Sequence, residues 1–140
     1  MSFYAKVLDG KVINIIIAEQ DFIDSYVDTS PGTWLRTDMN IKGGIYYDPI
    51  TKNPHPEQEK MIADDEGRQR KNFAQIGGTY DWKFNAFADV KLFEDWILNK
   101  TTFLWEPPTP KPIDGQNWDY SPSEKVWFVI PEGNGNGKSN

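Results

Sequence analysis

Apolar and polar residues alternate most regularly at the start of the chain. Residues 3–8 and 11–17 are two β-prone runs rich in aliphatic and aromatic side chains. Asp9 and Gly10 stand between these runs, and an Asp-Gly pair supplies the positive φ angles that a type I′ turn requires. The pattern therefore predicts two antiparallel strands joined by a tight turn.

The next segment changes to the spacing of a helix. Within residues 19–26 the apolar side chains recur at helical intervals, and acids come early, where they suit the positive end of the helix dipole. A Ser-Pro-Gly turn at 30–32 then precedes a β-prone run at 33–37. We predict that residues 1–47 form a unit of hairpin, short helix and strand.

Tryptophan pairs mark the C-terminal half of the chain. In two pairs the tryptophans are nine positions apart, and the second pair follows the first by 22 residues. Small polar residues open a turn inside each pair, at 99–102 and at 121–125, so each pair predicts a β-hairpin. The four residues are Trp96, Trp105, Trp118 and Trp127.

A third hairpin with shorter aromatic spacing is predicted upstream, where residues 77–81 and 86–88 flank the segment 82–85. The prolines of 107–112 favour an extended conformation and exclude a central strand, which predicts a stiff spacer or a sheet edge. These features together predict an aromatic β-hairpin region over residues 72–131.

Two segments lack the apolar side chains that order requires. Residues 48–71 contain three prolines, many charges and only three bulky aliphatic side chains, which predicts an exposed loop. A helical turn within 57–68 would have an apolar stripe too thin to hold it firmly. Residues 132–140 have no apolar side chain and predict a flexible tail.

The predicted fold class is mainly β with a short helix. It consists of antiparallel β-hairpins: the N-terminal hairpin-plus-helix unit, followed by an aromatic hairpin array. Two sheets packed as a sandwich would give the same alternation of short strands and turns, so the pattern leaves both arrangements open. At 140 residues the chain is long enough to bury a core without disulfides.

Composition removes several classes of function. The chain has no cysteine, which excludes disulfides, thiolate nucleophiles and cysteine-ligated metals. Its 15 basic and 21 acidic side chains give a net charge of −6, which repels a nucleic-acid backbone. The apolar run 12–18 is too short to span a bilayer, and the first residues lack the features of a signal peptide. We expect neither nucleic-acid binding nor membrane insertion.

Residues that support catalysis or metal binding are few. The single histidine, His55, lies between two prolines in the segment with the least predicted order, so neither a histidine-based triad nor a multi-histidine metal site is expected. The acidic run 64–67 lacks the ligand spacing of a calcium loop and indicates a solvated surface. The glycine pairs at 43–44 and 77–78 lack the lysine of a phosphate loop and indicate turns. No cofactor is predicted.

Paired carboxylates are the remaining enzymatic option. Two acids flanked by aromatic rings would suit a glycoside hydrolase. No local pattern marks any pair as buried, so we expect solvated surface acids and no enzymatic activity. The acids considered are Glu94, Asp95, Glu106 and Asp114.

The six tryptophans suit two purposes, because an indole ring stacks on sugar faces and also fills the thin core of a small sheet. We expect core packing for most of them and exposure for Trp82 and Trp118, which border turns. The candidates for contact with a partner or a glycan are Trp82, Trp96, Trp105, Trp118, Trp127 and Tyr80.

Along most of its length the chain resembles small virion-associated proteins of marine tailed bacteriophages, especially cyanophages. The segments that carry the resemblance are 1–7, 12–18, 31–34, 43–47, 70–81 and 103–110. The family pattern has a Tyr-Ala-Gly-Ile-Gly-Tyr-Thr-Tyr-Asp core, an aromatic hairpin and a Trp-Glu-Ala-Pro ending. This chain departs from that pattern at Phe73, Gln75, Gly78 and Pro107.

The resemblance implies a structural or tail-fibre-like part of a virion, and no catalytic residue carries over from it. We therefore expect a protein that decorates the capsid or is built into the tail, made in the host cytoplasm. Its expected partners are other virion proteins and copies of itself, contacted through strand edges and aromatic side chains. A carbohydrate-binding module of a tail fibre that contacts host surface glycans is the alternative, and a glycan-degrading enzyme ranks below both.

Overall fold

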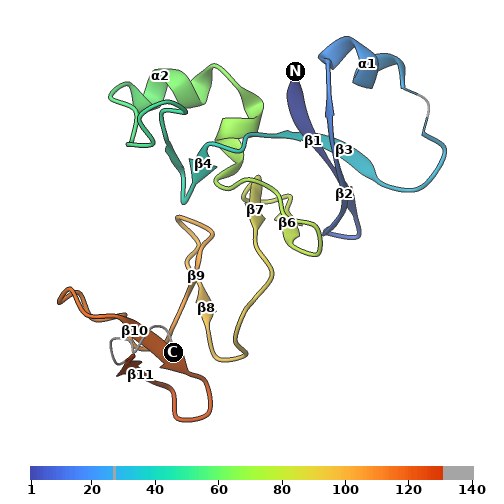
Figure 1. Ribbon diagram of the computed structural model, residues 1–140. Helices are drawn as coiled ribbons and strands as arrows, with labels where there is room; N and C mark the ends of the chain where they lie inside the picture. The colour runs from blue at the N-terminus through green and yellow to red at the C-terminus, as the bar shows by residue number, and fades with distance from the viewer. Residues whose placement is uncertain (27, 131–140) are drawn as a thin grey trace. The chain divides into compact units, whose positions relative to one another are not determined.

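The computed structural model describes residues 1–26 and 28–130 (Figure 1). The tail predicted over 132–140 lies outside the described residues. The chain divides into two compact units. The first unit comprises Met1–Lys91 and Leu98–Trp105, and the second comprises Leu92–Ile97 and Glu106–Asn140. Residues 72–91 thus lie in the same compact unit as the N-terminal hairpin.

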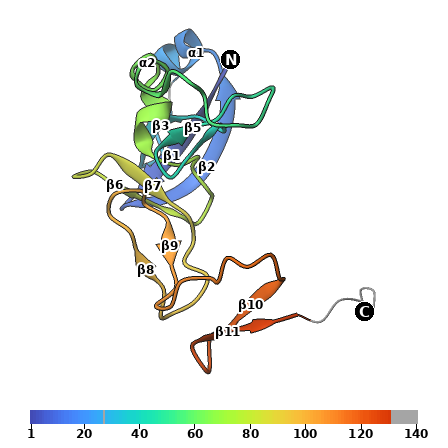
Figure 2. The same ribbon diagram turned by 90° about the vertical axis from the view of Figure 1, so that its left-hand side faces the viewer.

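A five-stranded antiparallel sheet with the order β3-β1-β2-β6-β7 organises the first unit, and Figure 2 shows its strands β1 and β2 side by side. Asp9 and Gly10 have φ angles of 50° and 76°, as a type I′ turn requires. The N-terminal hairpin and the mainly β, antiparallel fold class are therefore confirmed. The strands are β1 (Ser2–Leu8), β2 (Lys11–Ala18), β3 (Thr33–Thr37), β6 (Thr79–Asp81) and β7 (Ala86–Ala88).

The predicted short helix is α1 (Gln20–Ser25), which follows β2 directly. None of its residues is buried, so polar contacts with the sheet hold it. The Tyr4 hydroxyl donates to Gln20 Oε1 (2.8 Å), and Arg36 Nη2 donates to the same oxygen (3.0 Å). The chain then enters β3 at the residues predicted for that strand.

The segment 48–71 is largely exposed, but it is more regular than a loop, and a helix lies within the range 57–68 considered for a helical turn. It contains the helix α2 (Gln58–Ala63) and the 3₁₀ helix η1 (Glu66–Arg70), and it follows two short paired strands, β4 (Ile41–Lys42) and β5 (Ile45–Tyr46). The N-terminal side of α2 is fixed by Gln58, which accepts a hydrogen bond from the Tyr46 amide and donates one to the Tyr46 carbonyl.

Two buried residues of η1 attach this segment to the rest of the first unit. Arg70 is only 8% exposed, because its guanidinium donates to the Arg36 carbonyl oxygen (2.9 Å) and to Asn85 Oδ1 (3.0 Å). Gly67 lies so close to β3 that a Cβ atom there would come within 2.8 Å of the Thr37 carbonyl carbon. The residues that Arg70 and Gly67 contact are distant in sequence. The charge and glycine content of the segment alone therefore predicted that both residues are exposed to solvent.

The core of the first unit lies between the sheet and the segment that follows η1. Phe87 is fully buried at its centre, with Tyr80 and Phe87 rings 5.0 Å apart. The buried members of this cluster are Ala5, Val7, Val12, Ala74, Tyr80 and Phe87. A smaller buried cluster consists of Ala86, Ala88 and Phe103, with Leu98 packed against it.

All three predicted aromatic hairpins form. The first tryptophan pair gives β8 (Ile97–Leu98) and β9 (Trp105–Glu106), and the second gives β10 (Trp118–Ser121) and β11 (Val126–Val129). The third is the pair β6–β7, which encloses residues 82–85.

Four hairpins of the chain share one turn geometry. The side-chain oxygen of the first turn residue accepts a hydrogen bond from a backbone N–H two or three positions later, and the last turn residue has a φ between 53° and 65°. The copy at 48–52 has no aromatic bracket, and the sequence did not reveal it. The first residues are Asp48, Asp81, Asn99 and Ser121, and the last are Lys52, Asn85, Phe103 and Lys125.

Candidate binding surfaces

Trp82 lies on the turn of the β6–β7 hairpin and is 58% exposed, as its position beside a turn predicts. Its ring stands edge-on against Tyr80, with centroids 4.7 Å apart and an interplanar angle of 87°. Tyr80 itself is buried, and its hydroxyl donates to Asn85 Oδ1. Tyr80 is therefore a core residue of the first unit, although the sequence offered it as a candidate for contact with a partner.

Trp105 and Trp127 occupy the same position in two different hairpins and are held in the same way. The Trp105 indole N–H donates to the Asp89 carbonyl oxygen (2.7 Å), and Lys91 Nζ lies 5.4 Å from the ring centroid. Trp127 donates to the carbonyl of Thr109 (2.6 Å), with Lys111 Nζ at 6.0 Å. In both cases the lysine comes two residues after the residue whose carbonyl accepts the hydrogen bond. The indole N–H and one face of each ring are thus already in contact with the chain itself.

The core of the second unit is a cluster of four aromatic rings. Tyr120 is buried, with its ring 5.1 to 5.6 Å from the other three. Its hydroxyl donates to Asp95 Oδ2 (2.7 Å), and burial together with this bond raises the pKa of Tyr120 to about 12. The Trp96 indole N–H is buried within the described residues without an acceptor. The rings belong to Phe93, Trp96, Tyr120 and Trp127.

Trp118 is half-buried, whereas its position beside a turn predicted exposure. Its indole N–H donates to Asp114 Oδ1 (2.8 Å). This bond and the backbone N–H of Gln116 hold the pKa of the Asp114 carboxyl below its ordinary value. A local carboxylate thus fixes the ring, and the sequence spacing of four residues was the signal for it.

The tryptophans do not build a flat platform for sugars. In the described part of the chain, no tryptophan stacks parallel to a neighbouring ring: the interplanar angles of its ring pairs run from 45° to 87°. Two adjacent coplanar exposed rings, which a carbohydrate-binding face of this kind needs, are not found around any of them.

Two of the four acids considered for glycoside hydrolysis accept hydrogen bonds from aromatic side chains. Asp95 accepts from Tyr120, and Asp114 accepts from Trp118. His55 is half-buried beside Tyr46, and its Nδ1 accepts from the Glu57 amide (3.0 Å). Among residues 1–26 and 28–130, no three histidine, aspartate or glutamate side chains converge as a metal site requires.

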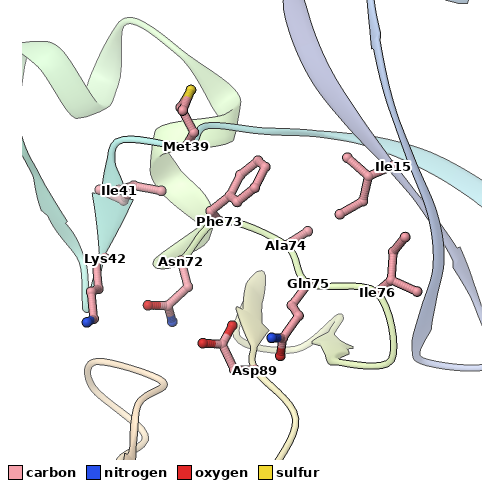
Figure 3. Close-up of a pocket in the computed structure, with 10 residues that line it drawn as sticks. All are labelled: Ile15, Met39, Ile41, Lys42, Asn72, Phe73, Ala74, Gln75, Ile76 and Asp89. Carbon is pink, nitrogen blue, oxygen red and sulfur yellow. The ribbon is translucent and has the colours of Figure 1, made fainter. Parts of the chain in front are cut away.

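An open apolar groove of about 620 Å³ lies in the first unit (Figure 3). In Figure 3 the polar side chains of Lys42, Asn72, Gln75 and Asp89 line its lower side, and the apolar ones lie above them. Burial raises the pKa of the Asp89 carboxyl, and Gln75 Oε1 accepts from the Val90 amide (2.8 Å). The apolar lining residues are Ile15, Met39, Ile41, Phe73, Ala74 and Ile76.

Sequence reasoning missed this groove because its lining comes from four separate segments. Residue 15 is on β2, 39–42 lead into β4, 72–76 follow η1, and residue 89 follows β7. No periodicity or motif links them. The groove has the volume of a small-ligand site, yet it is open: Met39 and Ile76 on its rim are both exposed.

None of the helices in the described part of the chain is long and apolar enough to cross a membrane. Comparison of the chain with protein-family models, with curated proteins and with solved structures finds no match.

Proposed function

We propose that the chain is a structural component of a bacteriophage particle. It decorates the capsid or is built into the tail, and it attaches through β-strand edges and apolar side chains without a cofactor. Its partners are other virion proteins and further copies of the chain. The proposal rests on the sequence resemblance together with the way the described residues use their chemistry.

One observation carries the proposal on the structural side. The polar groups beside the aromatic rings are used for internal hydrogen bonds, as Asp95 and Asp114 are, while large apolar side chains remain at the surface. A contiguous apolar surface is typical of a protein that is covered by a partner. The groove with exposed Met39 and Ile76 on its rim is such a surface.

Recognition of host glycans is a second candidate, favoured by the exposure of Trp82. A single exposed indole supported by a buried tyrosine suits stacking on one sugar ring. The lack of a second coplanar ring in contact with it makes this the weaker candidate.

Cryo-electron microscopy of the phage particle that encodes this chain tests both functions. An ordered, symmetric density on the head or tail, with the groove and Ile76 covered by a neighbour, is the expected result. Absence of the chain from purified particles, measured by mass spectrometry, would contradict the structural role. Density at a distal fibre tip with Trp82 facing solvent, and glycan-array binding that Trp82→Ala abolishes, would favour glycan recognition.

A further inference from the structure

One edge of β2 has no strand beside it. β2 pairs with β1 at every residue except Ile13, where the register shifts, but it pairs with β6 only through Lys11. Gly77 and Gly78 then bond to the backbone of Val12 (2.9 and 3.0 Å). From residue 14 to residue 18, no strand of the described chain lies on this side of β2.

The backbone groups at this edge are identified by Ile15. Its N–H donates to the Asn14 side chain (2.9 Å) at an exposed position, so it is not used in the ladder with β1 and points to the free edge. Backbone direction alternates along β2 beyond the register shift that leaves Ile13 without a partner on β1, so the N–H and carbonyl of Ile17 point the same way as those of Ile15. The edge therefore offers hydrogen-bonding groups at two positions, Ile15 and Ile17.

Apolar side chains surround these groups. Ile17 is 57% exposed, Ile13 is exposed, and Ile15 and Ile76 also line the groove of Figure 3. No charged residue lies between Lys11 and Glu19. Sheet edges that stay unpaired usually carry charges or prolines, and an apolar edge without them is ready to pair with another strand.

We infer that β2 pairs with β2 of a second copy of this chain. In antiparallel pairing with Ile16 opposite Ile16 of the partner, Ile15 of each copy lies opposite Ile17 of the other. The outward backbone groups then meet in both places, as two-fold symmetry demands. An edge with its free groups at these two positions is complementary to itself.

Charge and space support the same register. Lys11 stands at one end of β2, and Glu19 and Asp21 follow the other end, so antiparallel pairing brings opposite charges to the same end of the joined strands. Gly77 and Gly78 already form hydrogen bonds with the backbone of Val12, so only residues 14–18 of β2 can pair with the second copy. Because only a few residues of each copy are in contact, the dimer is expected to be weak and to dissociate on dilution.

Cysteine cross-linking tests this register directly, because the chain has no cysteine of its own. Residues opposite each other in a pair without hydrogen bonds have Cα atoms roughly 4.5 Å apart, which a disulfide spans. Mild oxidation of the Ile16→Cys variant is therefore expected to give a covalent dimer. The Ile50→Cys variant, with its cysteine on a distant exposed turn, is the control for random collision.

Sedimentation velocity over a concentration series tests the dimer in the full chain. The wild type and the Ile50→Lys variant, changed at a position 89% exposed, are expected to dimerise, and Ile17→Lys to remain monomeric at every concentration. Equal unfolding midpoints for the two variants, measured at a concentration low enough for both to be monomeric, show that Ile17→Lys acts on association and not on the fold of one copy.

A wild-type chain that stays monomeric, or an Ile16→Cys variant that cross-links no faster than Ile50→Cys, would overturn the inference. A dimer that survives Ile17→Lys would place the contact elsewhere and overturn it too. These outcomes concern the chain in solution and do not depend on whether it belongs to a virion.

Discussion

At the scale of single residues, Asn72 joins three segments of the first unit. Its side-chain N–H group lies within hydrogen-bonding distance of the carbonyl oxygens of Phe87, Thr102 and Phe103 (2.9 to 3.1 Å), and its oxygen accepts from the Gly43 amide. Asn72→Ala is expected to lower the free energy of unfolding by about 2–4 kcal/mol, because it leaves buried carbonyls without a donor. Urea unfolding followed by circular dichroism measures this change.

Asn53→Ala is the matched control for Asn72→Ala. Asn53 is exposed on the turn at 48–53, and the same substitution there is expected to change the free energy of unfolding by less than about 0.5 kcal/mol. Equal effects of the two substitutions would show that the hydrogen bonds of Asn72 do not stabilise the unit.

A second residue-scale prediction concerns Lys6, which is only 5% exposed. Its ammonium group contacts Asp28 and Ser30, and the hydrogen bonds from Lys6 and then from Ser30 hold the pKa of Asp28 well below its ordinary value. Because this pKa is lower in the folded chain than in the unfolded one, the pair stabilises the fold above about pH 4 and progressively loses this contribution at lower pH.

The variant Asp28→Asn isolates this contribution. It is expected to lower the thermal unfolding midpoint at pH 7, because it leaves the buried Lys6 ammonium without its counter-charge. The difference from wild type is expected to shrink as the pH falls from 4 to 2. Thermal melts at pH 7 and pH 2 measure both differences, and a difference that is unchanged between them would contradict the assignment.

At the scale of elements, the shared turn makes its own prediction. Lys125 ends the β10–β11 turn with a φ of 59°, a conformation that costs a non-glycine residue about 1–2 kcal/mol. Lys125→Gly removes that cost but gives the unfolded chain more freedom, so a net gain of about 0.5 kcal/mol is expected in the free energy of unfolding. The neighbouring Glu124→Gly, where φ is not positive, is expected to be destabilising instead.

Chemical denaturation of the two variants distinguishes them by sign. A loss of stability for both would show that the lysine side chain, and not the backbone conformation, matters at position 125.

Elements with local signals are the ones that the sequence could predict. The Asp9-Gly10 turn, the strand 33–37 and the tryptophan hairpins each depend on residues within one short window, and all of them form. The 3₁₀ helix η1 was missed because Arg70 finds its acceptors on β3 and on the β6–β7 turn, far away in sequence. The groove could not be predicted for the same reason, because its lining residues are far apart in sequence and come together only in the folded chain.

The exposure of the aromatic side chains could be predicted only in part from neighbouring residues in the sequence. Trp82 and Trp118 both border turns, but an aspartate four positions upstream binds the Trp118 indole. Tyr80 was predicted to contact a partner, yet strand alternation places it opposite Phe87 in the core. Whether each of these aromatic side chains is exposed therefore depends on its hydrogen bonds and on which face of the strand it lies, and aromatic content alone does not indicate either.

At the scale of the whole molecule, the two units have cores of different construction. The first centres on Phe87 beneath a sheet, whereas the second is a cluster of rings around Tyr120. The second unit is also discontinuous, because residues 92–97 supply two of its rings and the acceptor of the Tyr120 hydroxyl. A fragment that begins after residue 105 therefore lacks half of its core.

Titration of Tyr120 in two fragments tests this dependence, since Tyr120 is the only tyrosine after residue 91. In the fragment 92–140, ultraviolet absorbance is expected to give a pKa raised toward about 12, because burial and Asp95 both disfavour the phenolate. In the fragment 106–140, where Phe93, Asp95 and Trp96 are missing, it is expected near 10, the value of a free tyrosine. Asp95→Asn in the longer fragment removes the carboxylate charge that disfavours the phenolate but leaves the burial of the ring, so the pKa of Tyr120 should fall between the two. Since the neutral phenol is favoured by folding, the longer fragment also loses stability as the pH rises above about 10. Equal pKa values in both fragments would mean that residues 92–97 are not needed to build the second core.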